Sequence, residues 1–178
     1  MSSSAVSFGQ LLRRFRDNRT AASAVEFAIV APLFLALLFA IIETALMFFA
    51  GQVLETMTQD AARMILTGQA QTANYQQTDF KTYVCNQIPA IFSCANLIVN
   101  VQSFSSPSSA SYMSLFDASC NTPTLSYSPG GPGDTVLIQV GYKWQLFVTG
   151  FGYNIADCPN SQKKLVASAA FQNEPYSN

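Results

Sequence analysis

The sequence predicts an α+β membrane protein, with one long N-terminal helix and a small antiparallel sheet of about three strands packed on the helix's outer half. Three observations carry this prediction. An apolar run is long enough to cross a bilayer, apolar side chains continue beyond it at helical spacing, and two later segments alternate apolar and polar residues. Hydrophobic residues make up 49% of the chain, and charged residues only 11%.

The apolar run gives the first element, a transmembrane helix over residues 22–50. No residue between Glu26 and Glu43 is charged. With Glu43 at the far interface the span reaches about twenty residues, enough for one crossing. Pro32 lies inside this span, where it should bend the helix locally. We expect Glu43 to reach from the membrane edge toward water.

The flanking charges predict the orientation of this helix. Residues 1–21 form a basic leader, with four arginines against only Asp17. By the positive-inside rule this leader is cytoplasmic and the chain beyond about residue 50 lies outside the membrane. A cleaved secretory signal is the main competitor, but its apolar region normally spans about 7 to 15 residues, shorter than this run.

The same helix is predicted to extend beyond the membrane over residues 51–68. Apolar side chains recur there at three-and-four spacing, and Gly68 is a plausible end. Asp60 and Arg63, three residues apart, are expected either as a solvent-exposed pair or in contact with the outer sheet or a neighbouring subunit. The predicted helix, from about Ala22 to Thr67, would be about 70 Å long. The buried stripe comprises Val53, Leu54, Met57, Ala61, Met64 and Ile65.

Residues 69–178 are predicted to form a small α+β domain that covers the outer half of the helix. A short helix should begin at Asp79 and break near Pro89, and residues 103–133 are rich in Ser, Pro and Gly, as in a long surface excursion. Strands are expected over 96–104, 134–147 and 164–174. In the last two, one face is built for burial: Val136, Ile138, Val140, Tyr142, Trp144 and Leu146, then Leu165, Ala167, Ala169 and Phe171.

All four cysteines follow the apolar run, which favours two disulfides in an oxidising compartment. Four reduced thiols or a zinc site are the alternatives, although the sequence contains no C-x-x-C. Of three connectivities, we expect Cys85–Cys94, which closes a short loop, and Cys120–Cys158, which ties the excursion to the last interstrand loop.

Composition argues against several classes of function. The chain has no histidine, the commonest general base and a common metal ligand, so we expect no catalytic site, no metal and no cofactor. Only five basic residues lie beyond residue 20, so no nucleic-acid-binding face is expected.

Two quoted segments carry a resemblance to a known family. "AASAVEFAIVAPLFLALLFAIIE", followed by "DAAR" at residues 60–63, resembles the TadE-like minor pseudopilins of the tight-adherence (Tad/Flp, type IV pilus-like) system. The ending "LVASAAFQNEPY" and the pair Cys85 and Cys94 before a strand are also similar to this family.

The resemblance implies a role in pilus assembly or priming and in surface adhesion. A prepilin peptidase would cut between Ala21 and Ala22, with Ala21 in the place where the family usually has glycine. Glu26 and Phe27 would set the register between packed subunits, the carboxylate of Glu26 pairing with the new ammonium of a neighbour. The helix motif is Asp60, Ala61, Ala62 and Arg63.

The resemblance also implies location and partners. The chain would lie in the bacterial inner membrane with a periplasmic C-terminal domain, and in an assembled filament it would reach the extracellular pilus. Its partners would be other pilins and pseudopilins of the Tad system, the prepilin peptidase, the inner-membrane assembly platform and the lipid bilayer.

Two other interpretations stay open. The first is an uncleaved single-pass anchor or sensor with a periplasmic domain, which Ala21 favours. The second is a secreted enzyme behind a signal peptide, against which the lack of histidine and of a Ser or Cys with a base partner argues.

Overall fold

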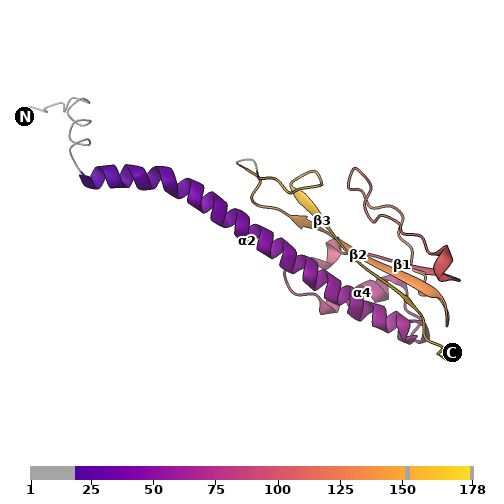
Figure 1. Cartoon of the computed structure of the whole chain (residues 1–178). Coiled ribbons are helices and arrows are strands. Elements are labelled where there is room, and N and C mark those ends of the chain that lie inside the picture. Colours follow the sequence, from indigo (N-terminus) through magenta and orange to yellow (C-terminus); the bar gives the residue numbers. More distant parts are fainter. Residues whose placement is uncertain (1–18, 151–152, 177–178) are drawn as a thin grey trace, which may run out of the picture. The chain divides into compact units, whose positions relative to one another are not determined.

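The computed structural model of the chain describes residues 19–150 and 153–176 (Figure 1). The chain is α+β, with a long N-terminal helix and a three-stranded antiparallel sheet, as the sequence predicts. It divides into two compact units, Met1–Ile42 and Glu43–Asn178, and each is described by itself.

The first unit is the beginning of α2, which runs over Arg19–Leu66 and begins three residues before the predicted start. Pro32 lies inside the helix without ending it. Its ring removes one i→i−4 hydrogen bond, and the local bend expected there stays a prediction. Most side chains of residues 23–42 are exposed. Most of the predicted leader, residues 1–18, lies outside the described residues.

The second unit contains the rest of α2 and two shorter helices. Gly68 ends α2 in the left-handed region, at φ 73° and ψ 6°, as predicted for a C-terminal glycine. One turn of helix follows as α3, Gln69–Thr72, and then α4, Gln77–Gln87. The helix α4 begins two residues before the predicted start because Asp79 caps it, accepting a hydrogen bond of 2.9 Å from the Gln76 backbone N–H.

Three strands form one sheet in the order β1-β2-β3. They are β1 (Ile98–Phe104), β2 (Thr135–Gln145) and β3 (Gln162–Gln172), and both pairs are antiparallel. In this register Ile138 lies opposite Val101 on one side and Ala169 on the other. Short 3₁₀ turns, η1 (Cys94–Asn96) and η2 (Pro107–Ser109), flank β1.

The core of the second unit lies between the outer part of α2, the helix α4 and one face of the sheet (Figure 1). The predicted helix stripe is buried at Leu54, Met57, Ala61 and Ile65, and partly buried at Val53 and Met64. Branched and aromatic side chains at alternate positions of β2 fit this face, because successive side chains of a strand point to opposite sides. The sheet contributes Val99, Val101, Val136, Ile138, Val140, Tyr142, Ala167 and Ala169.

The second face of the sheet is also covered, which the sequence did not predict. Residues 135–142 of β2 are all buried, so the simple alternation of buried and exposed positions does not hold. Leu115 and Phe116, from the excursion between β1 and β2, are 1% and 4% exposed and lie over Gly141, where an added Cβ would come within 3.0 Å of the Leu115 side chain. The excursion is therefore the second layer of the domain.

A buried polar pair joins β1 to β2 beneath this layer. Asn100 and Gln139 are both fully buried, and the Asn100 amide donates to Gln139 Oε1 over 3.2 Å. Gln139 donates in turn to the Met113 carbonyl over 2.7 Å, while Asn100 Oδ1 accepts from Ser126 N over 2.9 Å. These bonds meet the hydrogen-bonding needs of two amides that would be costly to bury alone.

Candidate functional site

The apolar part of α2 presents a long hydrophobic surface, and most of its described side chains are exposed. A stretch of α2 within Ser23–Leu66 is long and apolar enough to cross a membrane, and none of its most hydrophobic window is buried. Because soluble proteins rarely expose apolar surface on this scale, the surface is a candidate site for contact with lipid or with other apolar helices. Phe27, Ile29 and Leu33 are each 72% exposed.

The residues of the predicted processing and register site lie at the start of this surface. Ala21 and Ala22 belong to α2 by their backbone, while their side chains lie outside the described residues. Glu26 and Phe27 are exposed. Glu26 is the acidic residue nearest the amino end of α2, and the uncharged stretch of residues 27–42 follows it directly.

The motif Asp60–Ala61–Ala62–Arg63 has two buried and two exposed members. Ala61 and Ala62 are 0% and 5% exposed, and their small side chains let α2 pack close to the sheet. Asp60 and Arg63 are exposed, and within the described part of the chain they form no ion pair with each other. Their charged groups are therefore exposed, and their contact with a neighbouring subunit stays a prediction.

Arg63 also borders a shallow cavity of about 250 Å³ between α2 and β3. Ala169 and Ala170 line the opposite side, and small residues there leave the space open. The other lining residues are Gln59, Ala62, Leu66, Ser168 and Phe171.

Glu43 differs from expectation. It is only 5% exposed, although the sequence predicted a carboxylate reaching toward water. Both of its oxygens accept backbone hydrogen bonds from the segment after β2: Oε1 from Phe147 N, and Oε2 from Val148 N over 2.8 Å. Beside it, the hydroxyl groups of Thr44 and Tyr153 are hydrogen-bonded to each other. Glu43 is thus a structural link between α2 and the β2–β3 connection.

The structure forms two disulfides, Cys85–Cys94 and Cys120–Cys158, with the expected pairing. The first closes the loop after α4. Phe92, in that loop, packs edge-on against Tyr142 of β2, with their ring centroids 5.0 Å apart. This contact seats the disulfide-closed loop on the core face of the sheet.

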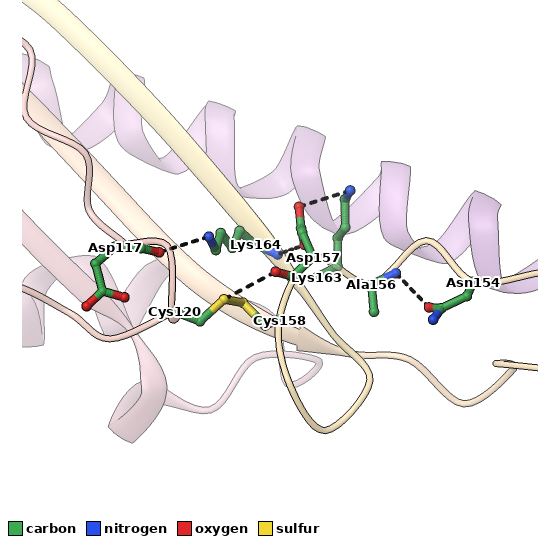
Figure 2. Close-up of polar contacts among 8 residues, drawn as sticks. All are labelled: Asp117, Cys120, Asn154, Ala156, Asp157, Cys158, Lys163 and Lys164. Carbon is green, nitrogen blue, oxygen red and sulfur yellow. Dashed lines mark hydrogen bonds and ion pairs between the residues drawn. A yellow bond between two sulfur atoms is a disulfide. The ribbon is translucent and has the colours of Figure 1, made fainter.

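The second disulfide lies in a polar cluster at the start of β3 (Figure 2). Asp157 forms an ion pair of 3.1 Å with Lys163 and accepts a hydrogen bond of 3.0 Å from Lys164 N. Lys164 Nζ donates to the Asp117 carbonyl over 3.1 Å, so the cluster ties the excursion to the last strand (Figure 2). The carboxylate of Asp117 in turn accepts a hydrogen bond of 2.8 Å from Asn121 N.

The pKa values of the two carboxylates in this cluster, Asp157 and Asp117, are lowered from their ordinary values. Partial burial raises the pKa of Asp157, but hydrogen bonds from Lys164 N and Lys163 and the charge of Lys163 together outweigh burial, and the net pKa is lowered. The hydrogen bonds from Asn121 lower the pKa of Asp117. Both groups are therefore ionised near neutral pH, which suits a structural cluster.

Within residues 19–150 and 153–176, no three His, Cys, Asp or Glu side chains lie close enough together to hold a metal ion. The polar clusters found there join parts of the fold to one another.

These features define a class: within the described residues the chain has one candidate membrane-spanning helix, which continues into a disulfide-bonded α+β domain. Residues 21–63 match the family model described as TadE-like protein, which confirms the resemblance over the apolar helix and the Asp60–Arg63 motif. No curated protein and no solved structure matches the chain.

Proposed function

We propose that this chain is a minor pseudopilin of a tight-adherence pilus, anchored in the bacterial inner membrane with its disulfide-bonded domain in the periplasm. One observation carries the proposal: Glu26 directly precedes the exposed apolar stretch of α2, inside the segment that matches the TadE-like family. The chain's similarity to that family supports an association with pilus components, and the uncovered helix supplies the surface through which subunits would pack.

The role we propose for Glu26 is electrostatic. After removal of residues 1–21, Ala22 carries a new ammonium group, and in a filament the carboxylate of Glu26 pairs with the ammonium of an adjacent subunit. An unpaired charge in the hydrocarbon region costs about 2.5 to 3.5 kcal/mol on insertion scales. Pairing relieves this cost only in one register, so the charge would select how neighbouring helices align, with Phe27 packing beside it.

The outer domain contributes the second assembly surface. Asp60 and Arg63 are exposed on α2 while the alanines between them are buried, so the motif holds the helix on the sheet and presents two charges outward. Other pilins and pseudopilins of the Tad system are the proposed partners for these charges, together with the assembly platform in the inner membrane. The protein acts as a structural component, and as a substrate of the prepilin peptidase.

Mass spectrometry of the chain extracted from membranes tests the proposal. We expect a mature form that begins at Ala22 in cells with the prepilin peptidase, and the full-length form in cells without it. Ala21→Gly, which restores the usual residue before the cut, should increase the cleaved fraction, and Ala21→Leu should decrease it. A chain that retains residues 1–21 in peptidase-positive cells would contradict the proposal.

The same experiment decides the second candidate, an uncleaved single-pass anchor or sensor, which Ala21 favours. That candidate predicts a full-length wild-type chain in both strains. A cut after a small residue at positions 45–51 would instead indicate ordinary signal-peptide cleavage.

A further inference from the structure

The β2–β3 connection exposes an aromatic ring at the position where the chain is tied to Glu43. Phe147 is 84% exposed, the largest exposed fraction among the large hydrophobic residues described. Its backbone N–H is bound by a carboxylate that is itself 5% exposed. The backbone of Phe147 is therefore held firmly while its side chain points away from the domain. We call residues 147–150 the Phe147 loop.

Two hydrogen-bonded links fix the segment that carries this loop on consecutive residues of α2. The Glu43 carboxylate accepts hydrogen bonds from the backbone N–H groups of Phe147 and Val148, and the Thr44 hydroxyl is hydrogen-bonded to the Tyr153 hydroxyl. Burying a carboxylate is costly unless hydrogen bonds compensate, and here both oxygens accept one. The Phe147 loop thus has a defined height along α2, at residue 43.

Residue 43 marks the end of the apolar stretch of the helix. Residues 27–42 carry no charge, and about twenty apolar residues cross a bilayer, so the hydrocarbon boundary falls close to Glu43. This step rests on the proposed membrane anchoring. Just past Glu43, the helix still exposes apolar side chains that suit an interface: Leu46 at 52%, Phe48 at 66% and Phe49 at 56%.

The chemistry of the connection also fits a bilayer interface. Between Lys143 and Asp157 no residue is charged. Phe side chains insert at the boundary between headgroups and acyl chains, as they do on the apolar face of helices that lie in a membrane interface. An uncharged loop gives no preference for anionic lipids, so zwitterionic phospholipid is a sufficient ligand.

We propose that the Phe147 loop is a second membrane contact of this protein, separate in sequence from the transmembrane helix and inserted at the boundary between headgroups and acyl chains. Glu43 is the positioning residue, since it holds the loop at the height of that boundary. The outer domain would then be fixed against the bilayer at two points.

Tryptophan quenching by lipid bromine tests this proposal in the full chain. The protein is reconstituted at high lipid-to-protein ratio in phosphatidylcholine vesicles with brominated acyl chains, in a Trp144→Phe background that removes the single native tryptophan. Three variants are compared: Phe147→Trp in the loop, Phe39→Trp in the apolar helix, and Tyr112→Trp as a control. Tyr112 is 65% exposed and belongs to the excursion between β1 and β2.

We expect strong quenching for Phe39→Trp, intermediate quenching for Phe147→Trp, and for Tyr112→Trp none beyond that seen in solution. Quenching of Phe147→Trp no larger than that of Tyr112→Trp, while Phe39→Trp is quenched, overturns the loop contact and leaves the anchoring intact. Absence of quenching for Phe39→Trp overturns the membrane anchoring itself, and the loop contact with it.

Two further measurements separate the remaining explanations. Glu43→Ala in the Phe147→Trp chain should reduce the quenching, and unchanged quenching would overturn the positioning role of Glu43. A blue shift of the Phe147→Trp emission that weakens as protein is diluted in lipid would assign the ring to a second copy of the chain and overturn the assignment to lipid.

Discussion

The aromatic ring of Tyr176 lies against Gly68, two residues after the last residue of α2. Gly68 has a positive φ of 73°, and a Cβ added there would overlap the Tyr176 ring. Tyr176 also donates a hydrogen bond of 3.3 Å to the Gly130 carbonyl, and Glu174 N donates to the Leu66 carbonyl over 3.0 Å. The segment after β3 therefore closes the end of the long helix.

Gly68→Ala should destabilise the outer domain. A left-handed conformation costs a residue with a Cβ about 1 to 2 kcal/mol, and overlap with Tyr176 adds to this. Thermal unfolding of the full chain in detergent, followed by circular dichroism, measures the effect. Gly51→Ala is the matched control: Gly51 lies inside α2 with nothing within 4 Å of an added Cβ, so its replacement should stabilise the helix by about 0.5 to 1 kcal/mol. Equal effects at the two sites would contradict the packing described.

The two disulfides should differ in their contribution to stability. Their sequence separations are 38 residues for Cys120–Cys158 and 9 for Cys85–Cys94. In the chain-entropy model these loops correspond to about 4 and about 2.6 kcal/mol. Replacing both cysteines of a pair by serine, in separate variants, should therefore cost more for Cys120 and Cys158, as measured by chemical denaturation. Non-reducing peptide mapping checks the pairing, and free thiols in chain taken from cells would contradict an oxidising compartment.

Tyr127 should make the domain sensitive to alkaline pH. Burial, with smaller contributions from the charges of Asp79 and Tyr75, raises the pKa of Tyr127 from 10.0 to about 12. Between these values the folded chain keeps a proton that the unfolded chain has lost, so stability falls as the pH rises above 10. The loss is at most about 2.7 kcal/mol, and less because the ring is only partly buried.

Tyr127→Phe tests this assignment. The Tyr127 hydroxyl is buried without a hydrogen-bond partner among the described residues, so its removal should leave the stability at pH 7 unchanged or raise it by about 1 kcal/mol. The contact with Phe80, at 5.5 Å between ring centroids, is kept. Denaturation curves at pH 8 and pH 11 should lie closer together for this variant than for wild type, whereas Tyr112→Phe, at an exposed tyrosine, should not change their separation.

Glu26→Gln separates membrane insertion from assembly. Burying a neutral amide costs less than burying a charge, so the variant should insert at least as well as wild type. Assembly should fail, because the pairing with a neighbouring ammonium is lost. Membrane content, leader removal and surface piliation are scored separately in cells that carry only the variant. Normal piliation by an inserted and cleaved Glu26→Gln chain would show that this carboxylate has no role in assembly.

The sequence predicted the elements whose burial follows from local periodicity. The stripe from Leu54 to Ile65 and the alternation along Val136, Ile138 and Val140 describe surfaces that each element presents wherever it packs. Gly68 was predictable for the same reason, since the helix pattern stops there. The sequence also predicted an antiparallel sheet against the outer part of the helix.

Other features depend on contacts between distant segments, and local periodicity could not reveal them. Glu43 is buried because its carboxylate accepts hydrogen bonds from backbone N–H groups 104 and 105 residues away in the sequence. Nothing in the sequence near Glu43 predicts this distant contact. Gln139 reads as a solvent-facing position, but the excursion covers it and supplies its partner at Met113. The start of α4 at Gln77 was missed because Asp79, the third residue of the helix and the partner of Gln76 in a capping box, was interpreted as its beginning.

The bond from Glu174 N to the Leu66 carbonyl also sets the order in which the chain can mature. The two residues lie on opposite sides of the outer domain in sequence, so the end of α2 lacks this contact until β3 and the segment after it have been synthesised. Contacts between segments so far apart in sequence form slowly, because closing a long loop costs entropy before any stabilising contact is made. We therefore expect the unfinished domain to depend on protection by chaperones, and a chain whose synthesis stops before β3 to be degraded readily by proteases.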